Sequence, residues 1–272
     1  MSSSKINLFL SLLLMRKEFI FIFNKSNTFV TSNMKKNIPN IITSIYLFCG
    51  CCALACVFYG RFFNAFLFLF VGAWADYLDG LVARSLKVKS ELGKQLDSLA
   101  DMVSFGVVPG AIIYMLLVRG MIKNFESFPQ YLILAGLPAF LITVFAAVRL
   151  AKFNIDTRQS EDFIGLNTPA CTIFTVGLML MYHYDSYGLR AVVISPWLLY
   201  PTIVVLSYLL IAELPMFSFK FKNFKWVGNE MRFIFLILAL LFLVAFKEVA
   251  FSLIIIMYVL FGLFALIAPA KR

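Results

Sequence analysis

Long apolar segments recur along nearly the whole chain, and they constrain its fold more than any other feature of the sequence. A helix needs about 20 mostly apolar residues to cross the hydrocarbon core of a bilayer. Segments that approach this length lie at 39–59, 61–83, 95–118, 129–150, 168–184, 195–213, 231–246 and 249–268. We therefore expect an all-α polytopic membrane protein with about eight transmembrane helices.

The composition excludes a separate soluble domain. Hydrophobic residues make up 62% of the chain and charged residues 14%, with a mean hydropathy of +0.91, whereas soluble domains carry about 45–50% apolar and about 25% charged residues. The net charge of +10 would suit a nucleic-acid-binding protein, but the cations lie in short loops between apolar segments. That placement is typical of loops beside anionic lipid headgroups, so we expect the lipid bilayer as a partner and no nucleic acid.

The distribution of Lys and Arg predicts the orientation, because cytoplasmic loops carry an excess of these residues. With both termini in the cytoplasm, the outer loops hold only five cations, while 14 lie on the inner side. The five are Arg61, Arg119, Lys123, Arg190 and Lys247. We therefore predict a multi-pass protein of the cell (inner) membrane with both termini in the cytoplasm.

The first 33 residues do not fit this pattern. The apolar run 6–14 is too short to span a bilayer and is followed by Arg16 and Lys17, so it suits a short surface helix or a weak signal segment. Our hypothesis is that the native product begins at Met34, which makes 1–33 an N-terminal extension and 34–272 the membrane domain. An intact mass that includes residues 1–33, for protein made in its own host, would contradict it.

Four aspartates flank the loop between the second and third apolar segments. Asp76 and Asp79 are three residues apart, and Asp97 and Asp101 are four apart, so each pair projects from one face of its helix. A charged side chain inside a membrane helix costs about 2.5–3.5 kcal/mol and marks a functional site by default. Because the loop is short, we expect the helices to be antiparallel neighbours whose carboxylate pairs face each other at the cytoplasmic boundary.

Such a group of carboxylates predicts a metal site. Four carboxylates in one place repel one another unless cations lie between them. Mg²⁺ and Mn²⁺ prefer oxygen ligands and bind through carboxylates together with substrate phosphates, and two-metal sites catalyse phosphoryl transfer. We therefore predict phosphoryl-transfer chemistry with two Mn²⁺ or Mg²⁺ ions. A proton or cation path in a transporter is the alternative that the spacing alone leaves open.

The residues between the aspartates suit a phosphate-containing ligand. Gly80 and Gly93 remove side chains where a ligand approaches the backbone closely. The small side chain of Ala83 leaves space at the helix surface, and the guanidinium of Arg84 suits a diphosphate. Each has an ordinary alternative, since a glycine in a membrane helix often serves packing and an Arg at a helix end often marks topology.

The cysteines and the single histidine are weaker candidates for a functional site than the aspartates. Cys49, Cys52 and Cys56 share one helical face, so a metal site is conceivable, but we favour packing inside a membrane helix. We expect His183 in a loop without a partner, and we assign it no catalytic role.

The pattern Asp-x2-Asp-Gly-x2-Ala-Arg-x8-Gly-x3-Asp-x3-Asp, from Asp76 to Asp101, resembles the motif of the CDP-alcohol phosphatidyltransferase family at every specified position. The resemblance covers about residues 34–225, and it implies that family's membrane bundle, a homodimer and CDP-diacylglycerol as substrate. It further implies that Asp76, Asp79 and Asp97 hold the metal ions, while Asp101 holds one ion and acts as the general base. The CDP site that it implies is lined by Asn40, Thr43, Gly80, Ala83, Arg84 and Gly93.

The flanking residues are similar to the phosphatidylserine synthase branch of the family, which uses L-serine as the acceptor. The run 97–109 carries this likeness, and the branch that uses glycerol 3-phosphate typically has Lys where Met102 stands. Segment 163–170 is also similar, but it has Asn167 where the family pattern has Pro. We therefore predict transfer of the phosphatidyl group to L-serine, with glycerol 3-phosphate or inositol phosphate as alternative acceptors.

The carboxylate of serine would need a cation in a pocket of low dielectric constant. Arg149, at the cytoplasmic end of the fourth apolar segment, is our candidate. The alternative is that Arg149 serves only as a topology anchor.

Overall fold

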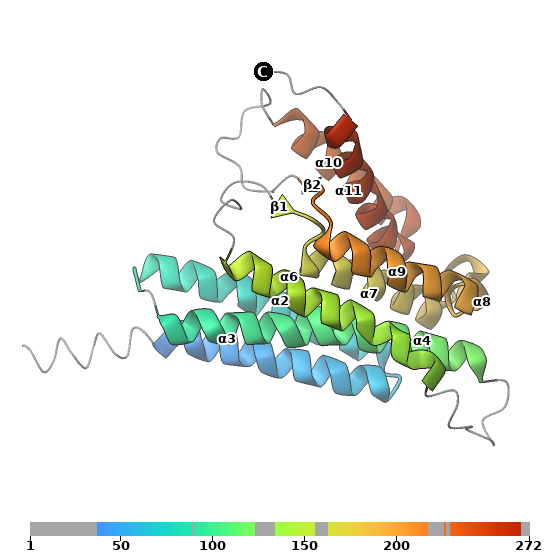
Figure 1. Ribbon diagram of the computed structural model, residues 1–272, viewed down its shortest axis with the longest axis horizontal. Coiled ribbons are helices and arrows are strands. Elements are labelled where there is room, and N and C mark those ends of the chain that lie inside the picture. Colours follow the sequence, from blue (N-terminus) through green and yellow to red (C-terminus); the bar gives the residue numbers. More distant parts are fainter. Residues whose placement is uncertain are drawn as a thin grey trace, which may run out of the picture.

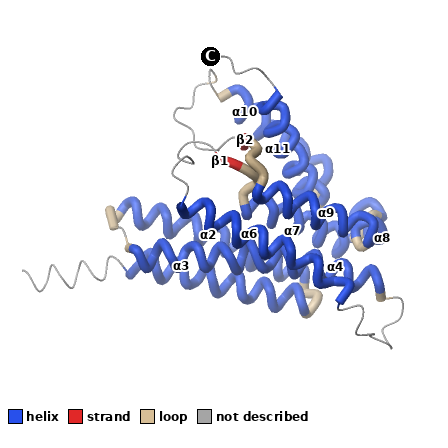
Figure 2. The backbone as a smooth tube through the Cα atoms, in the orientation of Figure 1, coloured by secondary structure: helices blue, strands red, loops and turns tan. Residues whose placement is uncertain are grey.

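The computed structural model describes residues 37–88, 90–122, 134–155, 163–216, 226 and 229–267. The predicted extension 1–33 lies outside the described residues. Nearly all of the described chain is helical (Figure 2).

Four helices are long and apolar enough to cross a membrane, and they confirm four of the predicted spans. They are Asn37–Phe58, Phe62–Ser85 (α2), Glu91–Met121 and Leu134–Ile155. The third is continuous through α3 (Glu91–Asp101), a π-helix η1 (Met102–Val107) and α4 (Val108–Met121). The fourth contains the 3₁₀ turn η2 (Leu137–Phe140) and α6 (Leu141–Ile155). These helices make the chain an integral membrane protein.

The other four predicted spans also correspond to helices, which are shorter. They are α7 (Thr168–Tyr184), α9 (Pro196–Ile211), α10 (Glu230–Phe246) and α11 (Val249–Ile267). A short turn η3 (Ser186–Gly188) and α8 (Arg190–Val193) join α7 to α9. Their lengths of 16 to 19 residues lie at or near the lower end of the range for spanning helices, so eight spans stay a prediction.

Two helix ends extend past the predicted boundaries by four and five residues. The third span begins at Glu91 instead of residue 95, because the Ser90 side chain caps the helix by accepting a hydrogen bond from the Gly93 amide at 3.2 Å. The fourth span continues past residue 150 to Ile155, where the Asn154 side chain donates a hydrogen bond to Ser98. Each extension contains polar residues, Glu91 and Lys94 in the first and Lys152 and Asn154 in the second, so a prediction based on apolar length ends before it. His183, expected in a loop, lies in the last turn of α7, with its ring 6.4 Å from that of Phe62.

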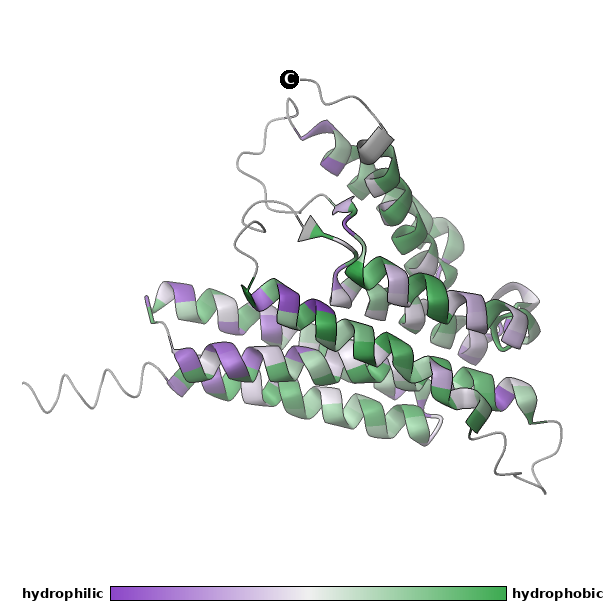
Figure 3. Ribbon diagram, in the orientation of Figure 1, coloured by the Kyte–Doolittle hydropathy of each residue, from purple (hydrophilic) through white to green (hydrophobic). Residues whose placement is uncertain are grey.

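Figure 1 shows the four long helices side by side, with α10 and α11 beyond α7 and α9. The start of the first helix, the end of α2, the start of α3 and the end of α6 lie at one end of this bundle. Figure 3 shows that the hydrophilic residues of these helices gather at the same end. This is the end that the distribution of Lys and Arg assigns to the cytoplasm.

The helix α4 is the centre of the core. Its residues Ile112, Ile113, Leu116 and Leu117 are completely buried, whereas large apolar side chains on the outer helices are exposed, such as Val244 at 77%. Exposed apolar surface of this extent suits a protein whose surroundings are lipid tails.

Small residues bring the helices of the core close together. A Cβ on Gly110 would lie 2.4 Å from the Thr143 hydroxyl, and one on Gly177 would lie 2.2 Å from the Ser252 hydroxyl. These contacts join α4 to α6 and α7 to α11 at short distances, which is the usual way that membrane helices pack.

One feature that the sequence analysis did not predict is a two-residue β-pairing. The strand β1 (Phe163–Ile164) pairs antiparallel with β2 (Pro215–Met216), which joins the segment before α7 to the segment after α9. Gly165 follows β1 with a φ of +78°, and a Cβ there would lie 2.6 Å from the Ala212 carbonyl oxygen. Strands of two residues are too short to leave an alternating pattern in the sequence.

Candidate active site

Three of the four predicted aspartates form one group at the hydrophilic end of the bundle. Asp76 on α2 and Asp97 and Asp101 on α3 each offer a carboxylate oxygen, and these atoms all lie within 4.8 Å of one another. The structure thus brings carboxylates of two antiparallel helices together, as their helical spacing predicts.

Asp79 lies outside this group and turns toward the first helix. One of its carboxylate oxygens is within hydrogen-bonding distance of the Thr43 hydroxyl, which also lies 3.0 Å from the Pro39 carbonyl oxygen. Asp79 and Thr43 are both buried. A threonine on the first helix therefore fixes the fourth carboxylate.

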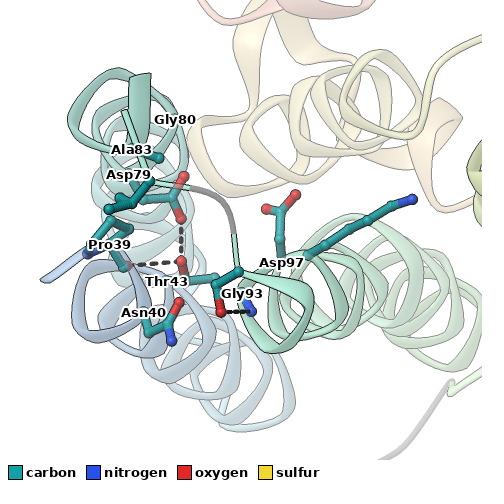
Figure 4. A pocket seen from close by; sticks show the side chains of 11 residues that line it. Pro39, Asn40, Thr43, Asp79, Gly80, Ala83, Gly93 and Asp97 are labelled. Carbon is teal, nitrogen blue, oxygen red and sulfur yellow. Dashed lines mark hydrogen bonds between the residues drawn. The ribbon is translucent and has the colours of Figure 1, made fainter. Parts of the chain in front are cut away.

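A cavity of about 250 Å³ adjoins the carboxylates, between the first helix, α2 and the start of α3. Figure 4 shows Asp79 and Asp97 pointing toward the same space from α2 and α3. The cavity is lined by Pro39, Asn40, Thr43, Asp79, Gly80, Ala83, Val88, Ser90, Gly93, Lys94 and Asp97.

The two glycines of the cavity have different environments. A Cβ on Gly93 would lie 2.7 Å from Oδ1 of Asn40, so the absence of a side chain on α3 makes room for an amide of the first helix. A Cβ on Gly80 would meet only Nη2 of Arg84, at 3.8 Å. Gly80 therefore leaves open space, whereas Gly93 permits a close contact between two helices.

The structure thus gathers most of the residues predicted for the CDP site. Asn40, Thr43, Gly80, Ala83 and Gly93 all line the cavity. Arg84 does not line it, and its side chain is exposed.

Two polar residues near the carboxylates were missed by the sequence analysis. Lys94 lines the cavity but was counted only as a loop cation, although its place directly after Gly93 could have indicated a role. Tyr46, completely buried, donates a hydrogen bond from its hydroxyl to Oδ1 of Asp101 at 2.9 Å. A tyrosine in an apolar helix needs a partner for its hydroxyl, which is the signal that could have revealed it.

Arg149 is buried on α6, at 7% exposure. Within the described part of the chain, its Nε and Nη2 atoms have no hydrogen-bond partner. Its guanidinium lies within electrostatic range of the Asp101 carboxylate. The residue is therefore a buried cation near the carboxylate group, outside the lining of the cavity.

Asn167, where the family pattern has Pro, has a clear structural role. It is the N-cap of α7, and its side chain accepts a hydrogen bond from the Ala170 amide at 2.7 Å. An asparagine at this position satisfies an amide at the helix start that no residue of the helix itself can satisfy.

The donor set of the carboxylate group fits a hard divalent cation. Carboxylate oxygens are the ligands that Mg²⁺ and Mn²⁺ prefer, and no Lys or Arg among the described residues forms an ion pair with Asp76, Asp97 or Asp101. Several carboxylates at such short distances repel one another unless a cation or a shared proton lies between them. In the described residues the cysteines belong to no comparable group of three potential ligands.

Comparison with known proteins gives a consistent result. Residues 36–209 match the family model of the CDP-alcohol phosphatidyltransferases. The CDP-diacylglycerol–serine O-phosphatidyltransferase of Bacillus subtilis is 32% identical over 188 residues, which are 69% of this chain and 91% of the relative. The Helicobacter pylori protein of the same name is 30% identical over 234 residues, 83% of this chain and 89% of the relative. The Methanocaldococcus jannaschii protein of that name is 35% identical over 133 residues, 48% of this chain and 59% of the relative.

Proposed function

Because the chain belongs to the CDP-alcohol phosphatidyltransferase family, we propose that it transfers the phosphatidyl group of CDP-diacylglycerol to the hydroxyl of L-serine. The products are phosphatidylserine and CMP. The names of the relatives support serine as the acceptor. The observation that carries the proposal is the group of three carboxylates beside a cavity of about 250 Å³.

The carboxylate group would hold the metal ions. Asp76, Asp97 and Asp101 offer oxygens within 4.8 Å of one another, and Asp79 borders the adjoining cavity. When bound, two Mn²⁺ or Mg²⁺ ions would offset the charge of the reacting phosphates and of the leaving CMP.

The cavity would bind the CDP group. Asn40 and Thr43 from the first helix supply polar groups. Gly80, Ala83 and Gly93 have no side chain or only a methyl group, so they leave space for the ligand along two walls of the cavity. Lys94 adds a positive charge suited to a phosphate, and Arg84 lies at the edge, with Nη2 3.8 Å from the position of a Cβ on Gly80. The ligand would thus lie between the first helix, α2 and α3.

Asp101 would act as the general base. Its carboxylate would take the proton of the serine hydroxyl while the hydroxyl oxygen forms a bond to the phosphorus that carries the diacylglycerol oxygen. The bond between this phosphorus and the bridging oxygen of CMP breaks, and CMP leaves with the electron pair. Asp101 suits this role because it belongs to the carboxylate group and also interacts with Arg149.

Arg149 would bind the carboxylate of serine. A buried guanidinium with two nitrogens that lack partners in the described structure is costly unless an anion accompanies it. A carboxylate can accept two parallel hydrogen bonds from one guanidinium. The electrostatic interaction between Arg149 and Asp101 suits an acceptor whose hydroxyl must reach Asp101.

The location and the assembly complete the proposal. An active site in the cytoplasm follows if the hydrophilic end of the bundle (Figure 3) faces inward, as the positive-inside rule indicates. The homodimer stays a prediction from the family resemblance.

The decisive experiment measures CMP release by purified protein in detergent. CDP-diacylglycerol, Mn²⁺ or Mg²⁺, and each candidate acceptor would be supplied in turn. We expect release with L-serine alone, abolished by EDTA. Release with glycerol 3-phosphate or inositol phosphate instead would contradict the acceptor. No release with any acceptor, together with no thermal protection by CDP-diacylglycerol or CMP, would favour the transporter alternative.

A further inference from the structure

The hydroxyl of Tyr46 lies beside the carboxylates, and the proposed reaction does not use it. Tyr46 is completely buried in the first helix, and its hydroxyl donates to Oδ1 of Asp101, on α3, at 2.9 Å. A buried tyrosine hydroxyl needs an acceptor, and most positions in an apolar helix would favour Phe instead. A tyrosine at this position therefore calls for an explanation.

The ring of Tyr46 is held by three elements. The Phe105 ring of η1 packs against it with centroids 5.7 Å apart, and a Cβ on Gly72 of α2 would lie 3.2 Å from Cδ2 of the ring. Ala75 and Ala100 complete this small buried cluster. Contacts on several sides leave the ring little freedom, so the hydroxyl has a defined position relative to Asp101.

The backbone that follows Asp101 is also fixed by neighbouring helices. Asp101 is the last residue of α3, and the π-helix η1 begins at Met102. The carbonyl oxygens of Phe105 and Gly106 accept hydrogen bonds from Thr172 at 3.3 Å and from Thr143 at 2.9 Å. Single π-helical turns are frequent at functional sites, and here the turn places Phe105 against Tyr46.

We propose that Tyr46 is a positioning residue, which binds one carboxylate oxygen of Asp101 and so leaves the other oxygen for the cation shared with Asp76 and Asp97. Partners that orient metal-binding carboxylates change metal affinity or activity about 10- to 100-fold when they are removed. The assignment of Asp101 as the base rests on the proposed function, but the effect on cation binding does not.

The test replaces Tyr46 by Phe, which keeps the ring and removes the donor. Tyr200→Phe is the matched control, because the Tyr200 hydroxyl donates to the Ala135 backbone oxygen at 2.9 Å and the residue lines no part of the carboxylate cavity. Mn²⁺ binding to the purified protein without substrate is measured from the EPR signal of the free ion. We expect the affinity to fall about 10-fold or more in Tyr46→Phe and less than about twofold in the control.

A double-variant cycle shows whether Tyr46 acts through Asp101. In an Asp101→Asn protein, Tyr46→Phe should change the Mn²⁺ affinity by less than about twofold, because contacting residues of one network are not additive. Two outcomes would contradict the proposal: a Mn²⁺ affinity of the Tyr46→Phe protein equal to that of the wild type, or an equal loss of affinity whether residue 101 is Asp or Asn. Either would show that Asp101 accepts a hydrogen bond from the Tyr46 hydroxyl without being positioned by it.

Two further measurements separate this proposal from the proposed function. The kcat for serine-dependent CMP release should fall about 10- to 100-fold in Tyr46→Phe, while the KM for CDP-diacylglycerol stays unchanged, since no cavity residue is altered. If the wild-type protein releases no CMP with serine, the acceptor is wrong, yet the Mn²⁺ comparison still decides the role of Tyr46.

If the Tyr46→Phe protein does not fold, the Gly72→Ala protein tests the positioning role of Tyr46 instead. It retains the hydroxyl and pushes the ring, so we expect weaker Mn²⁺ binding, and an unchanged affinity would contradict the proposal.

Discussion

The two sides of the carboxylate group differ in how their polar side chains are satisfied. On the cavity side, Asp79 has a hydrogen-bonding neighbour in Thr43, and the Ser90 hydroxyl accepts from the Gly93 amide. On the other side, Arg149 is buried with two nitrogens that have no partner in the described residues. Within the described residues, the first region has its polar groups satisfied, while the second has two nitrogens without a partner, and it is there that we propose the serine carboxylate binds.

This difference shows which kind of interaction each ligand would make. A ligand in the cavity would meet walls whose shape is already set by contacts between helices. Its affinity would therefore depend on how well its shape matches these walls. A ligand at the proposed Arg149 site would supply hydrogen-bond acceptors to the two nitrogens without a partner, so its affinity would depend on the anion that it carries. Substitutions on the two sides should therefore affect the two substrates separately.

The largest effect is expected at Asp101, where the two sides meet. Asp101→Asn removes the proposed base and one carboxylate of the group, so serine-dependent CMP release should fall about 10³-fold or more. The measurement is kcat under saturating substrates. Glu91→Gln, at an exposed position in the first turn of α3, is the control and should stay close to wild type. Substantial activity in Asp101→Asn would mean that another group accepts the proton.

The next effect should fall on serine alone. Arg149→Ala removes the cation proposed for the serine carboxylate, so the KM for serine should rise about 100-fold, as is typical when a buried charged pair loses one member. The KM for CDP-diacylglycerol should change little. Lys152→Ala, at an exposed position on the same helix, is the control. Equal changes in both KM values would show that Arg149 is a structural residue.

Substitutions in the cavity should have the opposite effect, raising the KM for CDP-diacylglycerol more than the KM for serine. A Cβ on Gly93 would lie 2.7 Å from Asn40, so Gly93→Ala must shift the first helix or the amide, and the KM for CDP-diacylglycerol should rise about 10-fold by loss of fit. Gly80→Ala is the comparison, because its methyl group would enter open space. It should leave thermal stability without ligand unchanged or higher, since Ala favours helices. An equal loss of stability in the two variants would contradict the different roles of these glycines.

The sequence predicts the cavity side better than the Arg149 side, for a physical reason. Asp76 to Asp101 lie within one local pattern, and helical periodicity is enough to place them on facing helices. The hydrogen bond of Tyr46 with Asp101 and the electrostatic interaction of Arg149 with Asp101 join segments far apart in the chain. Such contacts follow from how the helices pack, which no local pattern determines. Arg149 could be nominated only because the chemistry of serine requires a cation.

The positions of the helices were likewise predictable, while details at their ends were not. Apolar length located the longer helices, but it did not predict α8, the Ser90 cap at the start of α3, or η1, whose carbonyl groups accept hydrogen bonds from Thr143 and Thr172. The cap and the bonds to η1 are individual hydrogen bonds between polar atoms, and the average apolarity of a segment does not reveal them.

The smallest effect is expected at Asn167, which does not line the cavity and serves as the N-cap of α7. Asn167→Ala removes the bond to the Ala170 amide, so α7 should lose about 1 kcal/mol, and the unfolding midpoint in detergent should fall by about 2–4 °C. Asn167→Pro should cost less, because φ at this position is −73°, which suits proline, and proline reduces the entropy of the unfolded chain. Both variants should keep wild-type KM values. A changed KM for serine in Asn167→Ala would instead place the start of α7 at the acceptor site, on the side of Arg149.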